Sequence, residues 1–245
     1  MAEPPRDHGP EIRFVIFGAK VRGDLQISRE RHRASGLPDG LTVSRRPPDD
    51  LQAMHRVKPL SSLYAESAVM TAVMTAEAAS TVLGRPVETD PVSYLADTLG
   101  IITALAEAHG PGAVISDLNG HFLRPLEAWM RQVHAHDPPD PRSLVHILVN
   151  QEPSGAMFLS TRGMRTLGAP DIAVPDVTED WRAAAVSMLE RFVMMAGQGI
   201  HPTVRRQISM EGVPEGLEIT EGADDFRPYF DNRHITIQAP PPTRH

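Results

Sequence analysis

Cysteine is absent from this chain of 245 residues. That absence excludes disulfides, thiolate metal sites and a cysteine nucleophile. Lysine occurs only at Lys20 and Lys58, so nearly all of the basic charge is arginine. The formal net charge is -7, which gives no general attraction to phosphate backbones or anionic lipid and therefore disfavours a nucleic-acid partner.

Long apolar runs are also missing. Thr, Glu or Gly interrupts every apolar stretch before the roughly 18 residues that a membrane-spanning helix requires. Residues 1–10 are polar and proline-rich, without the apolar segment of a signal peptide. We therefore expect a soluble cytoplasmic protein that does not contact a membrane.

The strongest catalytic motifs do not occur. The chain has no glycine-rich loop ending in Gly-Lys-Ser/Thr, no His-Glu-x-x-His and no Gly-x-Ser-x-Gly. No enzyme class and no cofactor is therefore indicated by motif, and whether the chain is an enzyme stays open.

The composition is that of a globular protein, with 41% hydrophobic and 22% charged residues. We expect disordered tails at 1–10 and 239–245 and a single domain over 11–238. Within it, residues 22–59 are rich in proline and glycine and predict an irregular insertion. Two interpretations of this insertion remain, a mobile lid or an excursion with short strands.

The hydrophobic pattern predicts both helices and strands. Helices are expected at 60–84, 92–109, 126–134 and 178–196, with a short helical turn at 161–167. Strands are expected at 12–21, 113–116, 143–149, 156–160, 204–209, 217–220 and 234–238. Because most of these strands lack crossover helices, the pattern favours an α+β fold with an antiparallel or mixed sheet. A doubly wound α/β sheet is the alternative.

Thr161, Arg162 and Arg165 form the first candidate site. They stand where a buried strand gives way to a short helix, whose free N–H groups and neighbouring arginines suit a small anion. The structural alternative is that Thr161 caps the turn and an arginine pairs with Asp171.

Asp117 and His121 form the second candidate site, at the end of the strand expected over 113–116. A carboxylate and an imidazole in such a place can act as acid and base or bind a metal. The alternative is an ordinary turn in which Asp117 and Asn119 bond to their own backbone and Gly120 supplies a positive φ.

The third candidate site comprises Asp224, Asp225 and Asp231, which lie close to aromatic residues and could bind a divalent cation or a protein. Their order does not follow that of an EF-hand loop. The alternative is a turn that leads into the last strand. His146, within an expected strand, is interpreted as a satisfied edge or core histidine.

One segment resembles a known family. The run Thr161-Arg162-Gly163-Met164, followed by Leu167-Gly168-x-Pro170-Asp171, is similar to an uncharacterised bacterial domain-of-unknown-function family with a Thr-x-Gly-Leu/Met motif and then Phe-Gly-x-Pro-Asp/Glu. Leu167 stands where that family usually has Phe. The resemblance extends over about 60–238 and implies a bacterial cytosolic domain, with no established activity to transfer.

Two functions remain. The favoured hypothesis is a non-catalytic binding or interaction protein of a regulatory, accessory or toxin-neutralising kind, with a protein partner. The alternative is a hydrolase or transferase acting on a small anionic substrate, possibly assisted by a metal. In it Arg162 and Arg165 hold the anion, and Asp117 and His121 serve as base or metal ligands. That alternative requires the strand ends near Ser116 and Ser160 to be neighbours. The oligomeric state is open.

Overall fold

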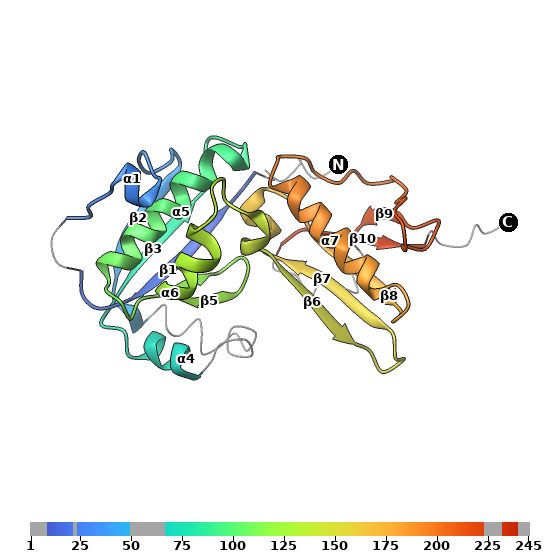
Figure 1. Ribbon diagram of the computed structural model, residues 1–245, viewed down its shortest axis with the longest axis horizontal. Helices are drawn as coiled ribbons and strands as arrows, with labels where there is room; N and C mark the ends of the chain where they lie inside the picture. The colour runs from blue at the N-terminus through green and yellow to red at the C-terminus, as the bar shows by residue number, and fades with distance from the viewer. Residues whose placement is uncertain (1–8, 22–23, 50–66, 223–231, 240–245) are drawn as a thin grey trace, which may run out of the picture.

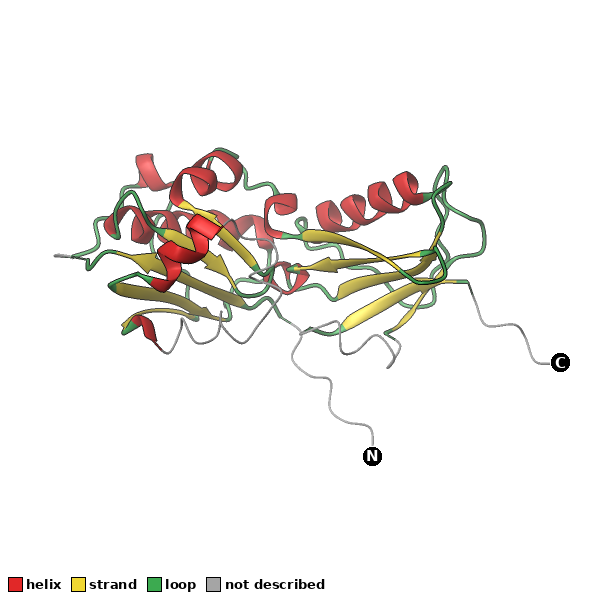
Figure 2. Cartoon of the chain, turned by 90° about the horizontal axis from the view of Figure 1, so that it is seen from below, coloured by secondary structure: helices red, strands yellow, loops and turns green. Residues whose placement is uncertain are grey.

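Two five-stranded sheets lie side by side, and the long helices cover the same side of both (Figure 1, Figure 2). The computed structural model describes residues 9–21, 24–49, 67–222 and 232–239. The first sheet has the order β2-β3-β1-β4-β5 and the second the order β6-β7-β8-β10-β9. Because all neighbours are antiparallel except the parallel pair β8 and β10, the predicted α+β fold is confirmed.

The first sheet contains five antiparallel strands: β1 (Ile12–Gly18), β2 (Leu41–Arg46), β3 (Ala78–Gly84), β4 (Val114–Asp117) and β5 (Phe122–Pro125). Its central strand β1, within the strand predicted at 12–21, is buried on both faces. Phe14 and Ile16 face the core beneath helix α5 (Pro91–Ala108), while Val15 and Phe17 pack in a second cluster with helix α4 (Ser67–Met74).

Helix α5 begins at Pro91, one residue before the predicted start at 92. Asp90 accepts a hydrogen bond from the Ser93 N–H at 3.2 Å, and Pro91 occupies the first turn, where its missing N–H costs nothing. Twelve of its 18 residues are buried, because the helix packs against β1 and β4 and against the segments 29–32 and 126–134. The Tyr94 hydroxyl reaches the second half of the chain and donates to the Thr166 carbonyl at 2.6 Å.

The second sheet contains β6 (His146–Gln151), β7 (Met157–Arg162), β8 (Asp171–Val177), β9 (Glu218–Glu221) and β10 (His234–Gln238). Helix α7 (Arg182–Ala196) packs on one face of it. The strands expected at 143–149 and 156–160 are present as β6 and β7, and they pair as an antiparallel hairpin. One hydrophobic cluster includes residues of both sheets, from Ile12 to Ile237, so a continuous core joins the halves.

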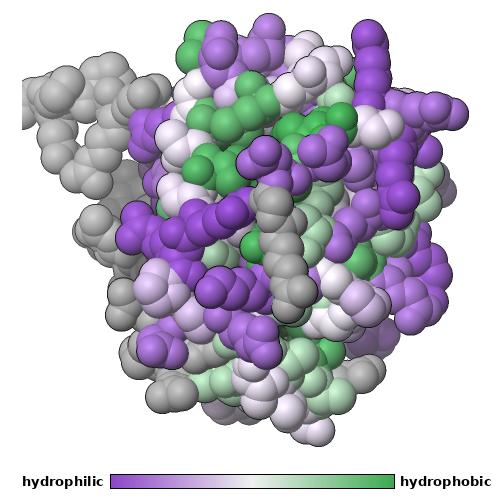
Figure 3. All heavy atoms as spheres, turned by 90° about the vertical axis from the view of Figure 1, so that its left-hand side faces the viewer, coloured by the Kyte–Doolittle hydropathy of each residue, from purple (hydrophilic) through white to green (hydrophobic). Residues whose placement is uncertain are grey.

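Short elements complete the chain. They are α1 (Arg29–His32), α6 (Leu126–Trp129), a π-helical turn (Met130–His134) and two 3-10 turns (Pro141–Leu144 and Met164–Leu167). Within the insertion expected over 22–59, the described part holds α1 and the edge strand β2, which fits an excursion with short strands. Figure 3 shows the end of the molecule that lies at the left of Figure 1. Hydrophilic and apolar residues are interspersed on this surface.

Several predicted elements were wrong. The helix predicted over 60–84 ends at Met74, and Ala78–Gly84 is instead β3, inserted between β1 and β2; residues 60–66 lie outside the described part. Strands β5 and β8 were not predicted. Residues 204–209 form no regular strand, although Arg205 donates its N–H to the Ile219 carbonyl alongside β9. Helix α7 starts at Arg182 rather than at 178.

No helix in the described residues combines the length and the apolar character needed to cross a membrane.

Candidate functional site

The first two candidate segments of the sequence meet where the two sheets adjoin. The turn between β4 and β5 rests on the loop that follows β7, and Asn119 Nδ2 donates to Thr166 Oγ1 at 3.0 Å. Gly163 has a φ of +109°, and a Cβ there would lie 3.2 Å from the Gly120 Cα. The strand ends near Ser116 and Ser160 are therefore brought together. We call the charged and imidazole side chains gathered here the polar junction: Asp117, His121, Arg124, His146, Arg162 and Asp171.

Asp117 is 1% exposed and organises the turn. Its Oδ1 accepts from the N–H groups of Asn119 at 2.9 Å and Gly120 at 3.0 Å, as the turn interpretation expects. The positive φ, however, belongs to His121 (58°) and not to Gly120. Asp117 Oδ2 is buried without a hydrogen-bond partner among the described residues. Burial raises the pKa of this carboxyl to about 6, so Asp117 can exchange a proton near neutral pH.

Arg124 reaches the same place from β5. Its guanidinium lies 3.7 Å from the centroid of the Phe122 ring, and that ring stacks on His146 with centroids 3.3 Å apart. Arg124 Nη2 donates to the Ser143 carbonyl at 2.6 Å, whereas the buried Nη1 has no hydrogen-bond partner in the described chain. Burial lowers the pKa of Arg124 to about 10, and the nearby carboxylate of Asp117 opposes this shift.

His146 begins a row of polar residues that crosses the second sheet. His146 on β6 is the register partner of Arg162 on β7, and Asp171 on β8 is the register partner of His234 on β10. Arg162 and Asp171 interact electrostatically between the two pairs. Burial, together with the charges of Arg124 and His121, lowers the pKa of His146 to about 3, so its ring is neutral at pH 7.

Asp171 is 2% exposed, and its carboxyl group is the hydrogen-bond partner of Thr161. Its Oδ1 accepts from Thr161 Oγ1 at 3.2 Å and from the Met164 N–H at 3.3 Å, and its Oδ2 accepts from Asn232 Nδ2 at 3.2 Å. Burial raises the pKa of Asp171 to about 7, despite these donors and Arg162. The Met164 N–H, at the start of the short helix, therefore donates to the chain's own Asp171 and not to a bound anion.

Arg165 points elsewhere. It forms an ion pair with Glu11, which also lies 3.6 Å from the Arg85 guanidinium. Of the third candidate site, Asp224, Asp225 and Asp231 lie outside the described residues. Among the residues that are described, no group of three or more carboxylate or imidazole side chains is arranged to hold a metal ion.

Arg124, Phe122 and Asn232 contribute to this region but are not predicted from the sequence. The strand β5 is only four residues long, too short for a recognisable alternation. Asn232 lies in the segment where the sequence suggests a turn before the last strand. Nothing in the local sequence indicates that its amide reaches Asp171, 61 positions earlier in the chain.

A separate open depression of about 540 Å³ lies on the surface. One segment of its wall brings two acidic side chains, Glu88 and Asp90, while His201 and Arg233 bring basic ones from two other segments. The remaining lining residues are mainly small or apolar: Gly9, Pro10, Thr89, Gly168, Pro170, Gln198, Gly199, Pro202, Val204 and Ile235.

Some residues that neighbour the lining residues in the sequence have exposed apolar side chains. Val87 and Ile200 are direct chain neighbours of lining residues, and Val92 follows Asp90 by two positions. They are 72%, 49% and 49% exposed, respectively. The volume falls within the roughly 300–1,000 Å³ that ligand pockets usually occupy.

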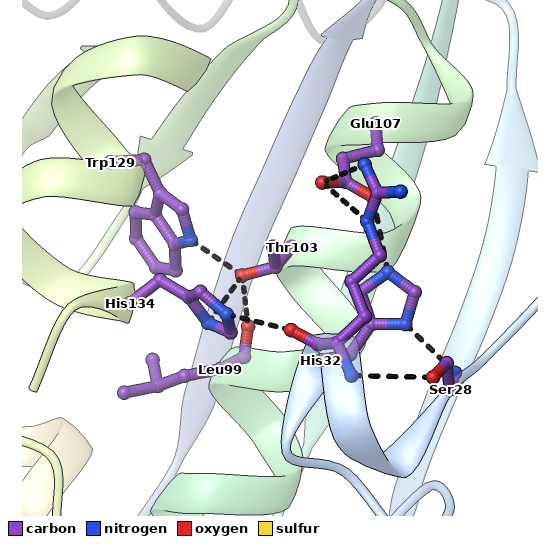
Figure 4. A network of polar contacts seen from close by, with 8 residues as sticks. Ser28, His32, Leu99, Thr103, Glu107, Trp129 and His134 are labelled. Atoms are coloured by element: carbon purple, nitrogen blue, oxygen red, sulfur yellow. Dashed lines mark hydrogen bonds and ion pairs between the residues drawn. The ribbon is translucent and has the colours of Figure 1, made fainter. Parts of the chain in front are cut away.

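A third polar cluster ties α1 to α5 (Figure 4). His32 Nε2 lies 3.1 Å from Glu107 Oε2, and the Ser28 N–H donates to His32 Nδ1 at 2.9 Å. Arg31 also donates to Glu107, at 2.9 Å. Both nitrogens of His32 are therefore used within the fold, which makes this a structural clasp and not an acid–base pair.

Trp129 and His134 connect the clasp to α6 and to the π-helical turn that follows it. Trp129 Nε1 donates to Thr103 Oγ1 at 2.9 Å, and His134 Nε2 lies 3.0 Å from the Arg31 carbonyl (Figure 4). The contacts of His134 come from residues far away in the chain, so no local sequence pattern indicates them.

Comparison of the chain with described protein families, with curated proteins and with solved structures gives no match. The resemblance to a bacterial family therefore stays a prediction.

Proposed function

We propose that this chain is a cytoplasmic, non-catalytic binding protein that takes a segment of a protein partner into the surface depression. The observation that carries the proposal is the combination of an open volume of about 540 Å³ with exposed apolar residues that lie next to its lining residues in the sequence. Exposed apolar groups close to a concave polar surface are typical of interaction sites.

The charge distribution supports a peptide-like occupant. Glu88 and Asp90 line the depression with carboxylates that accept from cationic or amide groups, and Asp90 also accepts from Ser93. His201 and Arg233 bring donors for carbonyls or carboxylates, and Arg233 also pairs with Glu221. A polypeptide presents both kinds of group. The engagement of Asp171 with Thr161, Met164 and Asn232 supports the same proposal, since these polar groups already hold one another.

The test is affinity capture from native lysate with quantitative mass spectrometry, using the full chain as bait. We expect a reproducible protein partner that is lost in the Ile200→Glu variant and retained in the Val43→Glu variant. Val43 is also an exposed apolar residue, but it lies on β2, away from the depression. No reproducible partner, or a partner retained by both variants, would argue against this site.

The second candidate function is a hydrolase or transferase that acts on a small anionic substrate at the polar junction. It is favoured by one observation: a buried acceptor, Asp117 Oδ2, and a buried donor, Arg124 Nη1, have no hydrogen-bond partners in the described chain. Asp117 would act as base, with His121 beside it and Arg124 and Arg162 near the anion.

Thermal unfolding in the presence of divalent metals, nucleotides and phosphorylated metabolites tests this second function. A ligand at about a hundred times its dissociation constant adds about 2.7 kcal/mol to the free energy of unfolding. For a chain of this length that raises Tm by roughly 5–10 °C. A rise that is lost in Asp117→Asn but kept in Asp140→Asn would favour the enzyme. No rise with any compound would count against it.

A further inference from the structure

The two sheets have four edge strands, and β6 differs from the other three. Strand β2 ends in Arg45-Arg46 and is followed by two prolines, and β5 has four residues including Arg124 and Pro125. Natural proteins protect sheet edges in this way, with charge, proline or short length, because an open edge pairs with other chains.

Strand β9 is protected by neighbouring backbone. It is four residues long and carries two glutamates. The Arg205 N–H donates to the Ile219 carbonyl at 2.7 Å, and the Ile219 N–H donates to the Arg206 carbonyl at 2.9 Å. The segment that precedes β9 therefore occupies its outer edge.

Strand β6 has none of these protections. Its six residues, His-Ile-Leu-Val-Asn-Gln, include no charged side chain and no proline, and its register with β7 is unbroken. In the described residues no backbone group outside β7 bonds to residues 147–151 of this strand. Val149 is 45% exposed, and the last two residues of the strand are exposed as well.

The hairpin geometry identifies which backbone groups point outward. The Glu152 N–H donates to the Ala156 carbonyl at 2.8 Å, in the same register as the rest of β6 and β7. Bonded and non-bonded pairs alternate along an antiparallel ladder. The N–H and C=O groups of Ile147, Val149 and Gln151 therefore point away from β7, toward the open edge.

We propose that β6 is a dimerisation strand, which pairs antiparallel with β6 of a second copy of this chain and joins the two second sheets into one. A two-fold axis at Val149 places Val149 opposite its own copy and Ile147 opposite Gln151 of the second copy. The outward-pointing N–H and C=O groups of Ile147, Val149 and Gln151 then face the same groups of the second copy. No like charges oppose each other.

A second copy fits this edge better than a charged peptide, because β6 offers no charge that would select one. The accessible stretch is 147–151, since Phe122 of the first sheet stacks on His146 at the other end of the strand. In Figure 1 the β6–β7 hairpin projects away from the first sheet.

A single introduced cysteine tests both the interface and its register, because the chain has no cysteine of its own. In a hydrogen-bonded antiparallel pair the Cα atoms are about 5.5 Å apart, within the roughly 4.4–6.8 Å that a disulfide spans. We expect V149C to form a disulfide-linked dimer under mild oxidation. The N150C control, whose two Cα atoms would lie roughly 8 Å apart, should link far more slowly.

Sedimentation equilibrium of the full chain, from low to high micromolar concentration, provides the second measurement. We expect a reversible dimer that V149K converts to a monomer, since two lysines would face each other, while V43K on edge strand β2 leaves the dimer intact. Circular dichroism confirms that each variant is folded. A wild-type chain that stays monomeric, or a dimer that survives V149K, would overturn the proposal, as would equal cross-linking of V149C and N150C.

Discussion

Gly163 and Gly120 lie so close that any side chain at Gly163 would enter the space between the two halves of the protein. A Cβ on Gly163 would stand 3.2 Å from the Gly120 Cα and 2.3 Å from the Leu144 carbonyl oxygen. This contact fixes the turn between β4 and β5 against the end of β7. It thereby brings Asp117 and Arg162, which are distant in the sequence, into one polar junction.

The Gly163→Ala variant should be strongly destabilised. Its φ of +109° and the overlap with backbone atoms both oppose a side chain, so we expect a loss of more than about 3 kcal/mol. Gly155→Ala is the matched control, because it has a φ of +88° with nothing within 4 Å and should lose only about 1–2 kcal/mol. Urea unfolding monitored by circular dichroism measures both. Equal losses would show that the contact is unimportant.

Thr161→Val should destabilise the second sheet at the row of polar residues. The Thr161 hydroxyl donates to Asp171 and accepts the Ile172 N–H at 2.8 Å, so its removal leaves two buried groups unsatisfied. We expect a cost of about 1–3 kcal/mol. Thr42→Val, which removes an exposed hydroxyl on β2, should change the free energy of unfolding by less than about 0.5 kcal/mol. Differential scanning calorimetry of the two variants decides, and a Thr161→Val variant as stable as wild type would contradict the assignment.

Asp117 should make the wild-type protein less stable as pH rises. Its pKa in the folded state is about 6, above the ordinary value of 3.8, so the folded state binds more protons between these values. Its contribution is complete below the ordinary pKa and is lost as pH rises through about 6. Asp117→Asn cannot ionise and should therefore gain, relative to wild type, on the order of 1–3 kcal/mol between pH 4 and pH 8.

Asp140→Asn should change the pH dependence of stability in the opposite direction to Asp117→Asn. Hydrogen bonds from Arg142 hold the pKa of Asp140 below its usual range. Its contribution is therefore present above the ordinary pKa and lost as pH falls. Guanidinium unfolding curves at a series of pH values should show the two variants diverging from wild type in opposite directions. If the free energy of unfolding of wild type and of Asp117→Asn changed with pH in parallel, the pKa of Asp117 would not be raised in the folded state.

Glu107→Gln should loosen the clasp that holds α1. Although burial raises it, hydrogen bonds from Arg31 and His32 hold the pKa of Glu107 below its usual range, which indicates an ionised carboxylate. Without that charge we expect faster amide hydrogen exchange over residues 29–33, with little change elsewhere. Glu127→Gln, which breaks an exposed pair with Arg131, should leave the exchange of α1 as in wild type. Unchanged exchange in Glu107→Gln would remove the clasp as an explanation for the position of α1.

Local sequence chemistry determined the elements whose causes are local. Asp90 and Pro91 define the start of α5, and the strand expected at 234–238 is β10 with the same bounds. The hairpin of β6 and β7 follows from two apolar runs with Gly155 in the turn between them, at a φ of +88°. In each case the propensity, the cap or the turn residue lies within a few positions of the element that it specifies.

Tertiary structure decided the rest. Small and β-branched residues over 78–84 fit either a buried helix or a buried strand, and only pairing between β1 and β2 made them β3. Likewise, sequence placed Asp117 and Thr161 in separate turns and could not show that Asn119 reaches Thr166 or that Thr161 holds Asp171. Those contacts depend on how two sheets pack, because hydrogen bonds between distant segments leave no periodic signal in the sequence.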